Sequence, residues 1–326
     1  VCSSDLAQES IETIEHSVIN HSMKTLKDEN RLVGFIGGPP CPDFSVAGKN
    51  KGKDGENGKL SQSYIDLIIE MMPDFFLFEN VKGLYRTLKH REFFEQIKNE
   101  LASAGYILHE RLINSIEYGA PQDRERIILV GFLDKSLAKK FEWSGQIYPN
   151  KEAFQFPWPT TNTYEEDSNM ECPQGIPEKL TIEYWFEKND VINHPNAKHV
   201  FTARAGLARF QSVEEGDDSK KSYKRLHRWR YSPTAAYGNN EVHLHPYKPR
   251  RITVAEALAI QSLPKDFELP ADMTLSNMFK TVGNGVPYIA ALGIAQSILQ
   301  HLGYSNEDNG IESGSGDFEL TQKYAV

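Results

Sequence analysis

Cysteine is scarce in this chain of 326 residues, where it occurs only at Cys2, Cys41 and Cys172. Three cysteines at these spacings fit neither a disulfide framework nor a zinc site, and a reducing cytoplasm is the default setting for such a chain. The sequence shows no apolar run as long as a membrane span and no secretory signal pattern in its first residues. We therefore expect a cytoplasmic protein without a membrane partner.

Positive charge is also in short supply, with 36 Lys and Arg residues against 45 Asp and Glu residues and a formal net charge of -9. Taken alone, this average argues against nucleic-acid binding. Phosphate contacts, however, need a basic face rather than a basic average. Residues 220–251 contain nine Lys or Arg and one acidic residue, Glu241, so the distribution of charge leaves nucleic-acid binding open.

Up to about residue 141, short apolar runs alternate with longer amphipathic ones. This alternation is typical of an α/β fold with a parallel sheet and helices on both of its faces. The predicted strands cover residues 32–36, 75–78, 106–113 and 126–132, and the predicted helices cover residues 7–28, 61–72 and 93–104.

The pattern changes beyond residue 141, where Pro, Asn, Trp and Tyr are frequent and periodicity is weak. Order returns after Arg251, because Thr253 and Glu256 have the spacing of a helix capping box, and a last apolar helix is predicted at 287–302. We expect a catalytic domain at 1–141, a smaller loop-rich domain at 142–247, a return to the catalytic domain at 248–303 and a disordered acidic tail at 304–326.

The first candidate site is the string Gly-Gly-Pro-Pro-Cys-Pro-Asp-Phe-Ser, residues 37–45, which follows the first predicted strand. Cys41 would lie at the carboxyl end of the sheet, where open α/β folds bind ligands. The flanking prolines stiffen the backbone and leave its carbonyl groups free to accept hydrogen bonds. A tight turn with an incidental cysteine is the alternative, but the full nine-residue string favours a nucleophile.

Two groups of polar residues accompany that string. Glu79 directly follows the second predicted strand, at the sheet edge expected for Cys41, where partial desolvation would raise the carboxyl pKa and allow proton donation. The alternative is a solvated or helix-capping carboxylate. Gln122, Arg124 and Arg126 would share one face of an extended segment, where two guanidiniums suit a phosphate, a carboxylate or the rim of a base. An exposed strand edge with alternating ion pairs is equally compatible.

Two further segments complete the series. Residues 251–264 predict a well-capped helix of structural importance. Residues 281–287, Thr-Val-Gly-Asn-Gly-Val-Pro, precede the last predicted helix, and they form either a loop that a ligand can approach or a simple turn.

In this order, the five segments resemble the DNA cytosine-5 methyltransferase family over roughly residues 34–302. Pro-Pro-Cys resembles its nucleophile motif, and Glu-Asn-Val, Gln-x-Arg-x-Arg, the capped helix and Gly-Asn-x-Val-Pro resemble its later motifs. Pro42 departs from the pattern, since Gln is commoner there. The resemblance implies a Rossmann-like, S-adenosylmethionine-dependent methyltransferase sheet with a target recognition domain at 142–247. It also implies a bacterial or phage monomer that acts on double-stranded DNA beside a separate restriction endonuclease.

The resemblance further implies a mechanism that needs no metal. The target cytosine leaves the stack, and the thiolate of Cys41 adds to its C6 atom. Glu79 would bond or protonate N3, while Arg124 and Arg126 would hold the base O2 atom. S-adenosylmethionine then supplies the methyl group to C5. Residues expected to contact the substrate are Pro39, Ser45, Lys49, Lys51 and Gln122; those expected to contact the cofactor are Pro40, Leu60, Asn284 and Val286.

The basic stretch 220–230, which is interleaved with aromatic residues, suits phosphate anchoring by the recognition domain. A solvated charged face is the alternative for this stretch. The sequence itself does not identify the DNA site that would be read.

One part of the family pattern is absent. The family opens with a Phe-x-Gly-x-Gly loop for the cofactor, followed by an acidic residue for its ribose, and neither occurs ahead of Leu32. The chain also begins with Val. We therefore expect an N-terminally truncated chain that lacks the first elements of the sheet, with weak or absent binding of S-adenosylmethionine.

Three alternative functions stay open at this point. An RNA (tRNA) cytosine-5 methyltransferase would use the same motifs, although the segment of roughly 100 residues at 142–247 favours DNA. A fragment that binds DNA but is inactive, through loss of the cofactor loop, is the second. A thiol hydrolase would need a histidine beside Cys41, and no histidine shares a motif with it.

Overall fold

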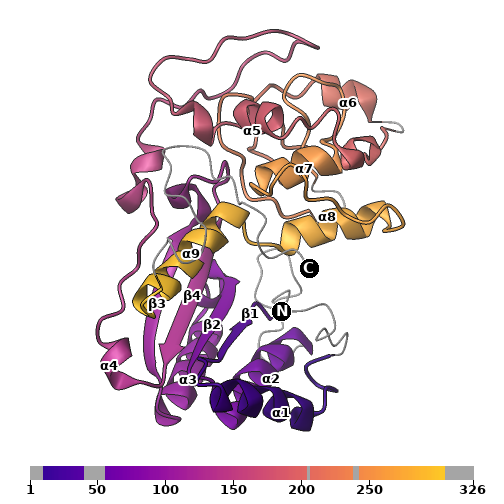
Figure 1. Cartoon of the computed structure of the whole chain (residues 1–326). Helices are drawn as coiled ribbons and strands as arrows, with labels where there is room; N and C mark the ends of the chain where they lie inside the picture. Colours follow the sequence, from indigo (N-terminus) through magenta and orange to yellow (C-terminus); the bar gives the residue numbers. More distant parts are fainter. Residues whose placement is uncertain (1–9, 40–55, 204–205, 238–241, 305–326) are drawn as a thin grey trace. The chain divides into compact units, whose positions relative to one another are not determined.

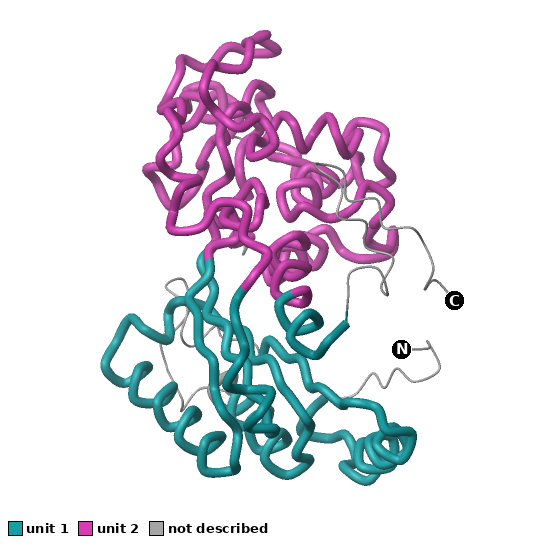
Figure 2. The backbone as a smooth tube through the Cα atoms, turned by 60° about the vertical axis from the view of Figure 1, so that its left-hand side comes forward, with its two compact units in different colours: residues 1–113, 125–143, 297–326 teal, residues 114–124, 144–296 magenta. Residues whose placement is uncertain are grey.

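The computed structural model describes residues 10–39, 56–203, 206–237 and 242–304. The chain divides into two compact units, which Figure 2 colours separately. The first unit comprises residues 1–113, 125–143 and 297–326, and the second comprises residues 114–124 and 144–296.

The first unit is built on a four-stranded sheet with the order β1-β2-β4-β3 (Figure 1). Strand β1 is parallel to β2, whereas β2 is antiparallel to β4. The prediction of a parallel sheet is therefore confirmed for β1 and β2 and wrong for β2 and β4. The physical reason is the short connection that leads into β4. Only ten residues join β4 to its sheet neighbour β3, and a parallel connection would need a longer helical crossover. The strands are β1 Gly34–Gly37, β2 Phe75–Val81, β3 Ile107–Asn114 and β4 Glu125–Phe132.

Helices α2 and α3 pack their apolar faces on this sheet, and the core contains Ile65 and Ile68 of α2, Ile97 of α3, and Phe76 and Phe78 of β2. A short 3-10 helix, η3, links the end of β2 to α3. The helical elements of this unit are α1 His16–Asp28, α2 Glu56–Met71, η3 Lys82–Tyr85, α3 Leu88–Ser103 and α4 Lys135–Ala138.

Strand β1 forms one edge of the sheet, and among the described residues it pairs with β2 alone. Its residues alternate between exposed and half-buried, and the side chain of Ile36 is 72% exposed. Sheets usually cover such an apolar edge residue or replace it with a charged one. The strand thus presents a row of backbone groups and one large apolar side chain to solvent.

The second unit is made of short helices and irregular segments around an apolar core, to which α5, α7 and α8 contribute Trp185, Leu258 and Phe279. Helix α7, predicted to belong to the catalytic domain, packs in this core. The functional division at residues 141 and 247 stays a prediction. The helical elements are η4 Ser115–Tyr118, η5 Pro149–Phe154, η6 Glu178–Leu180, α5 Ile182–Lys188, η7 Pro195–Lys198, α6 Leu207–Gln211, α7 Val254–Ile260 and α8 Leu275–Asn284. Helix α9, Tyr288–His301, begins in this unit, and its residues from 297 onward belong to the first unit.

Two sequence signals near the C-terminus can be compared with the structure. The capping box of α7 is confirmed, since the Thr253 hydroxyl accepts a hydrogen bond from the Glu256 amide at 3.1 Å and the Glu256 carboxylate accepts from the Thr253 amide at 2.7 Å. The stretch 275–301 is long and apolar enough to cross a membrane by composition. It is broken into α8 and α9, and Met278 and Phe279 of α8 are buried in the core of the second unit.

Candidate active site

The side chain of Glu79 lies on β2 and forms an ion pair with Arg126 of the neighbouring strand β4. The Oε1 atom of Glu79 and the Nε atom of Arg126 are 2.8 Å apart, and the two side chains are only 17% and 10% exposed. In the register of the strands, Glu79 pairs with Ile128, and Val81 pairs with Arg126. Glu79 and Arg126 are thus diagonal neighbours on one face, within reach of long side chains.

This placement corrects one expectation and qualifies another. The predicted strand ends at Phe78, but β2 continues to Val81, so Glu79 lies inside the strand rather than after it. Desolvation of the carboxyl was expected to favour its neutral form. The structure adds a partner that the prediction did not include, the guanidinium of Arg126.

Gly38 brings the backbone that follows β1 close to the same carboxylate. A Cβ atom at this position would lie 2.9 Å from the Oε2 atom of Glu79, which is closer than such atoms normally approach. Only glycine therefore allows the chain to pass the undisturbed carboxylate here. Pro39, the next residue, is half-buried, so the segment that leads to Cys41 leaves the sheet beside Glu79. The role of Gly38 was not foreseen, because a Gly-Gly pair before two prolines reads as a simple turn.

Five of the predicted site residues lie outside the described residues: Pro40, Cys41, Ser45, Lys49 and Lys51. Leu60 lies in α2 and is half-buried.

Arg124 belongs to the second unit, and its guanidinium is bound to backbone rather than open to a ligand. The side chain is 1% exposed. Its Nη1 atom donates to the carbonyl of Ala235 at 3.0 Å, and its Nη2 atom donates to the carbonyl of Gly283 at 2.7 Å. Gly283 lies in the last turn of α8, where carbonyl groups lack helical partners and a cation is favourable. Arg124 thus holds the end of α8.

Gln122 is fully buried and reinforces this arrangement. Its Oε1 atom accepts a hydrogen bond from the Ala235 amide at 3.1 Å, and its Nε2 atom donates to the Oε1 atom of Gln261 at 3.4 Å. Gln261 in turn donates to the carbonyl of Val282 at 2.6 Å. The predicted common face of Gln122, Arg124 and Arg126 is therefore not what the contacts show, because the first two residues bind backbone in the second unit and Arg126 binds Glu79 in the first.

Two residues predicted to contact the cofactor come directly after the end of α8 that Arg124 holds. Asn284 is the last residue of α8 and is exposed, while Val286 is half-buried in the short connection to α9. Their backbone is fixed one residue earlier by Arg124. An exposed carboxamide and a partly buried apolar side chain are compatible with a polar and apolar ligand surface.

The basic stretch 220–230 is organised differently from its expected role in phosphate anchoring. Arg225 is fully buried, and its guanidinium lies 3.9 Å from the centre of the Tyr164 ring. Its nitrogen atoms donate to backbone carbonyls, including those of Val213 at 2.9 Å and Lys248 at 3.1 Å. A buried guanidinium with these partners cannot reach a phosphate.

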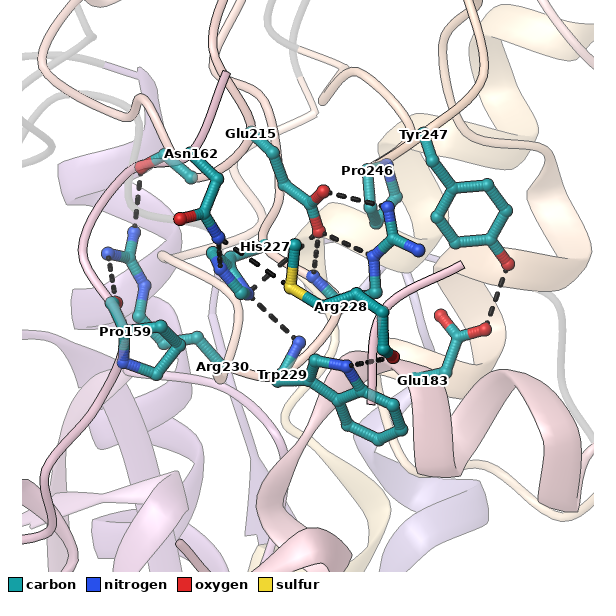
Figure 3. Close-up of polar contacts among 12 residues, drawn as sticks. Pro159, Asn162, Glu183, Glu215, His227, Arg228, Trp229, Arg230, Pro246 and Tyr247 are labelled. Carbon is teal, nitrogen blue, oxygen red and sulfur yellow. Dashed lines mark hydrogen bonds and ion pairs between the residues drawn. The ribbon is translucent and has the colours of Figure 1, made fainter. Parts of the chain in front are cut away.

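Arg228 is likewise buried, and Figure 3 shows it in a polar cluster with Glu215. Its Nε and Nη2 atoms contact the two carboxylate oxygens of Glu215 at 2.9 and 2.8 Å, and its guanidinium lies 4.2 Å from the centre of the Tyr247 ring. The prediction of phosphate anchoring is thus wrong for Arg225 and Arg228, because both stabilise the interior. Lys220 and Lys221 of the stretch are exposed.

Burial shapes the ionisation of this cluster. Burial would raise the pKa of Glu215, but hydrogen bonds from Arg228 outweigh it and hold that pKa below its usual value. Desolvation lowers the pKa of His227 to about 4. The neutral ring is also needed by the contacts, since Nδ1 of His227 accepts a hydrogen bond from the Trp229 amide at 3.0 Å.

Other features of the described residues lie away from these groups. A shallow hollow of about 990 Å³ runs along α3, with Ile69 and Leu88 in its lining, and contains none of the predicted site residues. The described part of the chain holds no group of three or more His, Cys, Asp or Glu residues placed to bind a metal ion.

Comparison with known proteins provides an independent view of the chain. The model of the C-5 cytosine-specific DNA methylase family matches residues 5–300. The Type II methyltransferase M.NmeDI of Neisseria meningitidis serogroup C is 64% identical over 283 residues, which are 86% of this chain and 66% of that relative. The Type II methyltransferase M.MthTI of Methanothermobacter thermautotrophicus is 30% identical over 83% of this chain and 79% of its own length. The chain thus spans about two thirds of the length of M.NmeDI.

Solved structures share the fold. A DNA modification methyltransferase encoded within an E. coli prophage matches with a TM-score of 0.59 and 24% identity, covering 91% of this chain and 86% of the other. The S. pombe Dnmt2 methyltransferase matches with a TM-score of 0.53 and 15% identity, covering 91% and 84%. These similarities support the α/β methyltransferase fold class.

The family match covers all five segments on which the resemblance was based. It also covers both compact units apart from their outermost residues. The predicted family is therefore confirmed: the chain belongs to the C-5 cytosine-specific DNA methylases.

Proposed function

We propose that this chain carries the nucleophile and base-binding groups that methylate C5 of a cytosine flipped out of double-stranded DNA. The observation that carries the proposal is the Glu79–Arg126 ion pair, which lies beside the backbone leading to the Pro-Pro-Cys segment. The carboxylate and the guanidinium provide hydrogen-bonding partners for a base, and the cysteine of the Pro-Pro-Cys segment, which follows Pro39 in the sequence, would supply the nucleophile for its ring.

The reaction begins at the base. The thiolate of Cys41 adds to C6, and Glu79 hydrogen-bonds to or protonates N3, which accepts the electron density displaced by the addition. Arg126 orients Glu79 and donates to the base O2 atom, while the carbonyl of Pro39 accepts from the exocyclic amine. Loss of the C5 proton and departure of the thiolate then restore the aromatic ring and free Cys41.

S-adenosylmethionine supplies the methyl group when bound. Leu60 in the first unit stays a predicted contact and is a half-buried apolar side chain; within the second unit, Val286 is a half-buried apolar side chain and Asn284 an exposed carboxamide. Arg124 and Gln122 act indirectly, by fixing the end of α8 before Asn284. The sequence ahead of Leu32 has no Phe-x-Gly-x-Gly loop, so we expect weak affinity for the cofactor. Calorimetry that gives a micromolar Kd would contradict this expectation.

The cellular role follows from the relatives. M.NmeDI and M.MthTI are Type II methyltransferases, and this chain would likewise protect DNA in a cytoplasmic restriction–modification system, with an endonuclease acting separately. The expectation that it acts as a monomer stays part of this proposal, as does the absence of a metal requirement.

A proton-exchange experiment tests the chemistry without the cofactor. Addition of Cys41 to C6 makes C5 nucleophilic, so that C5 can take a proton from water in place of a methyl group; loss of the original hydrogen and elimination then return cytosine. DNA tritiated at C5 should therefore release tritium with the unsubstituted chain and not with Cys41→Ser. Equal release by both proteins, or none by either, would contradict the proposal.

A further inference from the structure

A run of basic residues directly follows the β2 strand that carries Glu79. This run, the basic segment (residues 82–91), reads Lys-Gly-Leu-Tyr-Arg-Thr-Leu-Lys-His-Arg and contains no Asp or Glu. The side chains of Lys82, Arg86, Lys89 and Arg91 are exposed. Lys82 contacts Glu125 at 2.6 Å, and the acidic residue Glu92 directly follows the segment.

The backbone of the basic segment is firmly held. Leu84 and His90 are 1% and 3% exposed, and Nδ1 of His90 lies 3.2 Å from the carbonyl oxygen of Gly83. The Thr87 hydroxyl caps α3 by accepting a hydrogen bond from the His90 amide at 3.2 Å. The exposed cations therefore project from a fixed platform, which lowers the entropic cost of binding.

The basic segment lies at the end of the sheet where β1 and β2 terminate, next to the groups of the proposed chemistry. Strand β2 ends at Val81, two residues after Glu79, and η3 begins at Lys82. The parallel strand β1 ends at the same edge, where Gly38 approaches Glu79. DNA that delivers a cytosine to Glu79 would bring its backbone phosphates to this edge.

The helix start adds to the positive potential. Neither η3 nor α3 has an acidic residue in its first turn, although helix N-termini favour acidic residues. Helix α3 instead carries Lys89 and Arg91 near its start. Cations combined with the positive end of a helix make a surface that attracts anions.

We propose that the basic segment binds backbone phosphates of the duplex DNA that flanks the target cytosine, through Arg86, Lys89 and Arg91. This inference takes its partner from the proposed function. Because phosphate contacts release counterions, it predicts a specific salt dependence of DNA binding.

The test compares two variants of the full chain with the same loss of charge. One replaces Arg86, Lys89 and Arg91 with Gln; the other replaces Lys135, Lys139 and Lys140, which are exposed in and after α4. Because β4 is antiparallel to β2, α4 follows the end of β4 at the opposite edge of the sheet. The control therefore separates local contact from a general change in net charge.

Fluorescence anisotropy with duplex DNA at several salt concentrations gives the result. Each lost phosphate contact should lower affinity by about eightfold at 0.1 M salt and make the slope of log K against log salt less negative by about 0.9. The control should change affinity by less than about twofold. The double variant Arg86→Lys/Arg91→Lys keeps the charge and should bind as the unsubstituted chain does, which also shows that the basic segment is folded.

Several outcomes would overturn the inference: equal affinity of the two triple variants, loss of binding in the charge-preserving variant, no DNA binding by the unsubstituted chain, or an effect confined to folded RNA. Failure of the proposed function would look different. In that case DNA binding would depend on the basic segment, but tritium release from C5 would not occur.

Discussion

The Nε atom of Arg126 lies 2.8 Å from the Oε1 atom of Glu79 because β4 runs antiparallel to β2. This direction places a residue near the start of one strand beside a residue near the end of the other. The pair is therefore produced by strand order and register, with both side chains largely shielded from water. Glu79 and Arg126 should therefore depend on each other in catalysis.

A double-mutant cycle tests whether Glu79 and Arg126 depend on each other. Glu79→Gln removes the carboxyl group that hydrogen-bonds to or protonates N3 of the base, and it should lower the rate of C5 proton exchange by about 10²- to 10⁴-fold. Arg126→Gln should cost a similar factor, because Glu79 loses its orientation. The double variant should be little worse than either single variant, since residues that act together are not additive. Multiplication of the two single effects would show that they act independently.

Gly38→Ala should separate activity from stability. The added Cβ would meet the Oε2 atom of Glu79 at 2.9 Å, and a flexible carboxylate can yield at little energetic cost. We expect the free energy of unfolding to change by less than about 1 kcal/mol while proton exchange falls at least about tenfold, because misplaced catalytic groups reduce rates steeply. A large loss of stability at unchanged activity would contradict the close approach.

Much of the first unit was predictable, since each predicted strand overlaps an observed one. Periodicity did not reveal the extension of β2 through Glu79 and Asn80, because polar residues at a strand end resemble a loop until a partner strand pairs with them. It also did not reveal that Arg225 and Arg228 are buried. Their carbonyl and carboxylate partners come from distant segments, which a local pattern cannot identify.

Arg124→Met should destabilise the second unit. The substitution leaves the carbonyls of Ala235 and Gly283 without their charged donor in a buried setting. We expect the free energy of unfolding, measured in urea, to fall by about 2–4 kcal/mol. Arg209→Met is the matched control, since this exposed arginine overlies the Tyr223 ring at 4.9 Å, and it should cost less than about 1 kcal/mol. Equal effects would contradict the conclusion that Arg124 stabilises the end of α8.

The stability of the second unit should fall on mild acidification. Burial lowers the pKa of His227 from 6.5 to about 4, so the unfolded chain binds more protons between these pH values and stability is lost as the pH falls through them. The depression corresponds to about 3 kcal/mol. His227→Gln should flatten the dependence of unfolding free energy on pH in this window, although His243, whose pKa burial lowers to about 3, will still contribute. The exposed His21→Gln should leave the curve unchanged; a similar flattening there would refute the assignment.

The edge strand β1 has a consequence for how the protein behaves in concentrated solution. Its backbone groups and the exposed side chain of Ile36 form a template on which a strand from another molecule can add. Self-association through β1 would then compete with the soluble form as concentration rises. Ile36→Lys places a charge on that template and should reduce light scattering without altering the ion pair on the far side of β2. The highest concentration at which this methylase chain can be handled would thus depend on a short edge strand rather than on the Glu79–Arg126 pair.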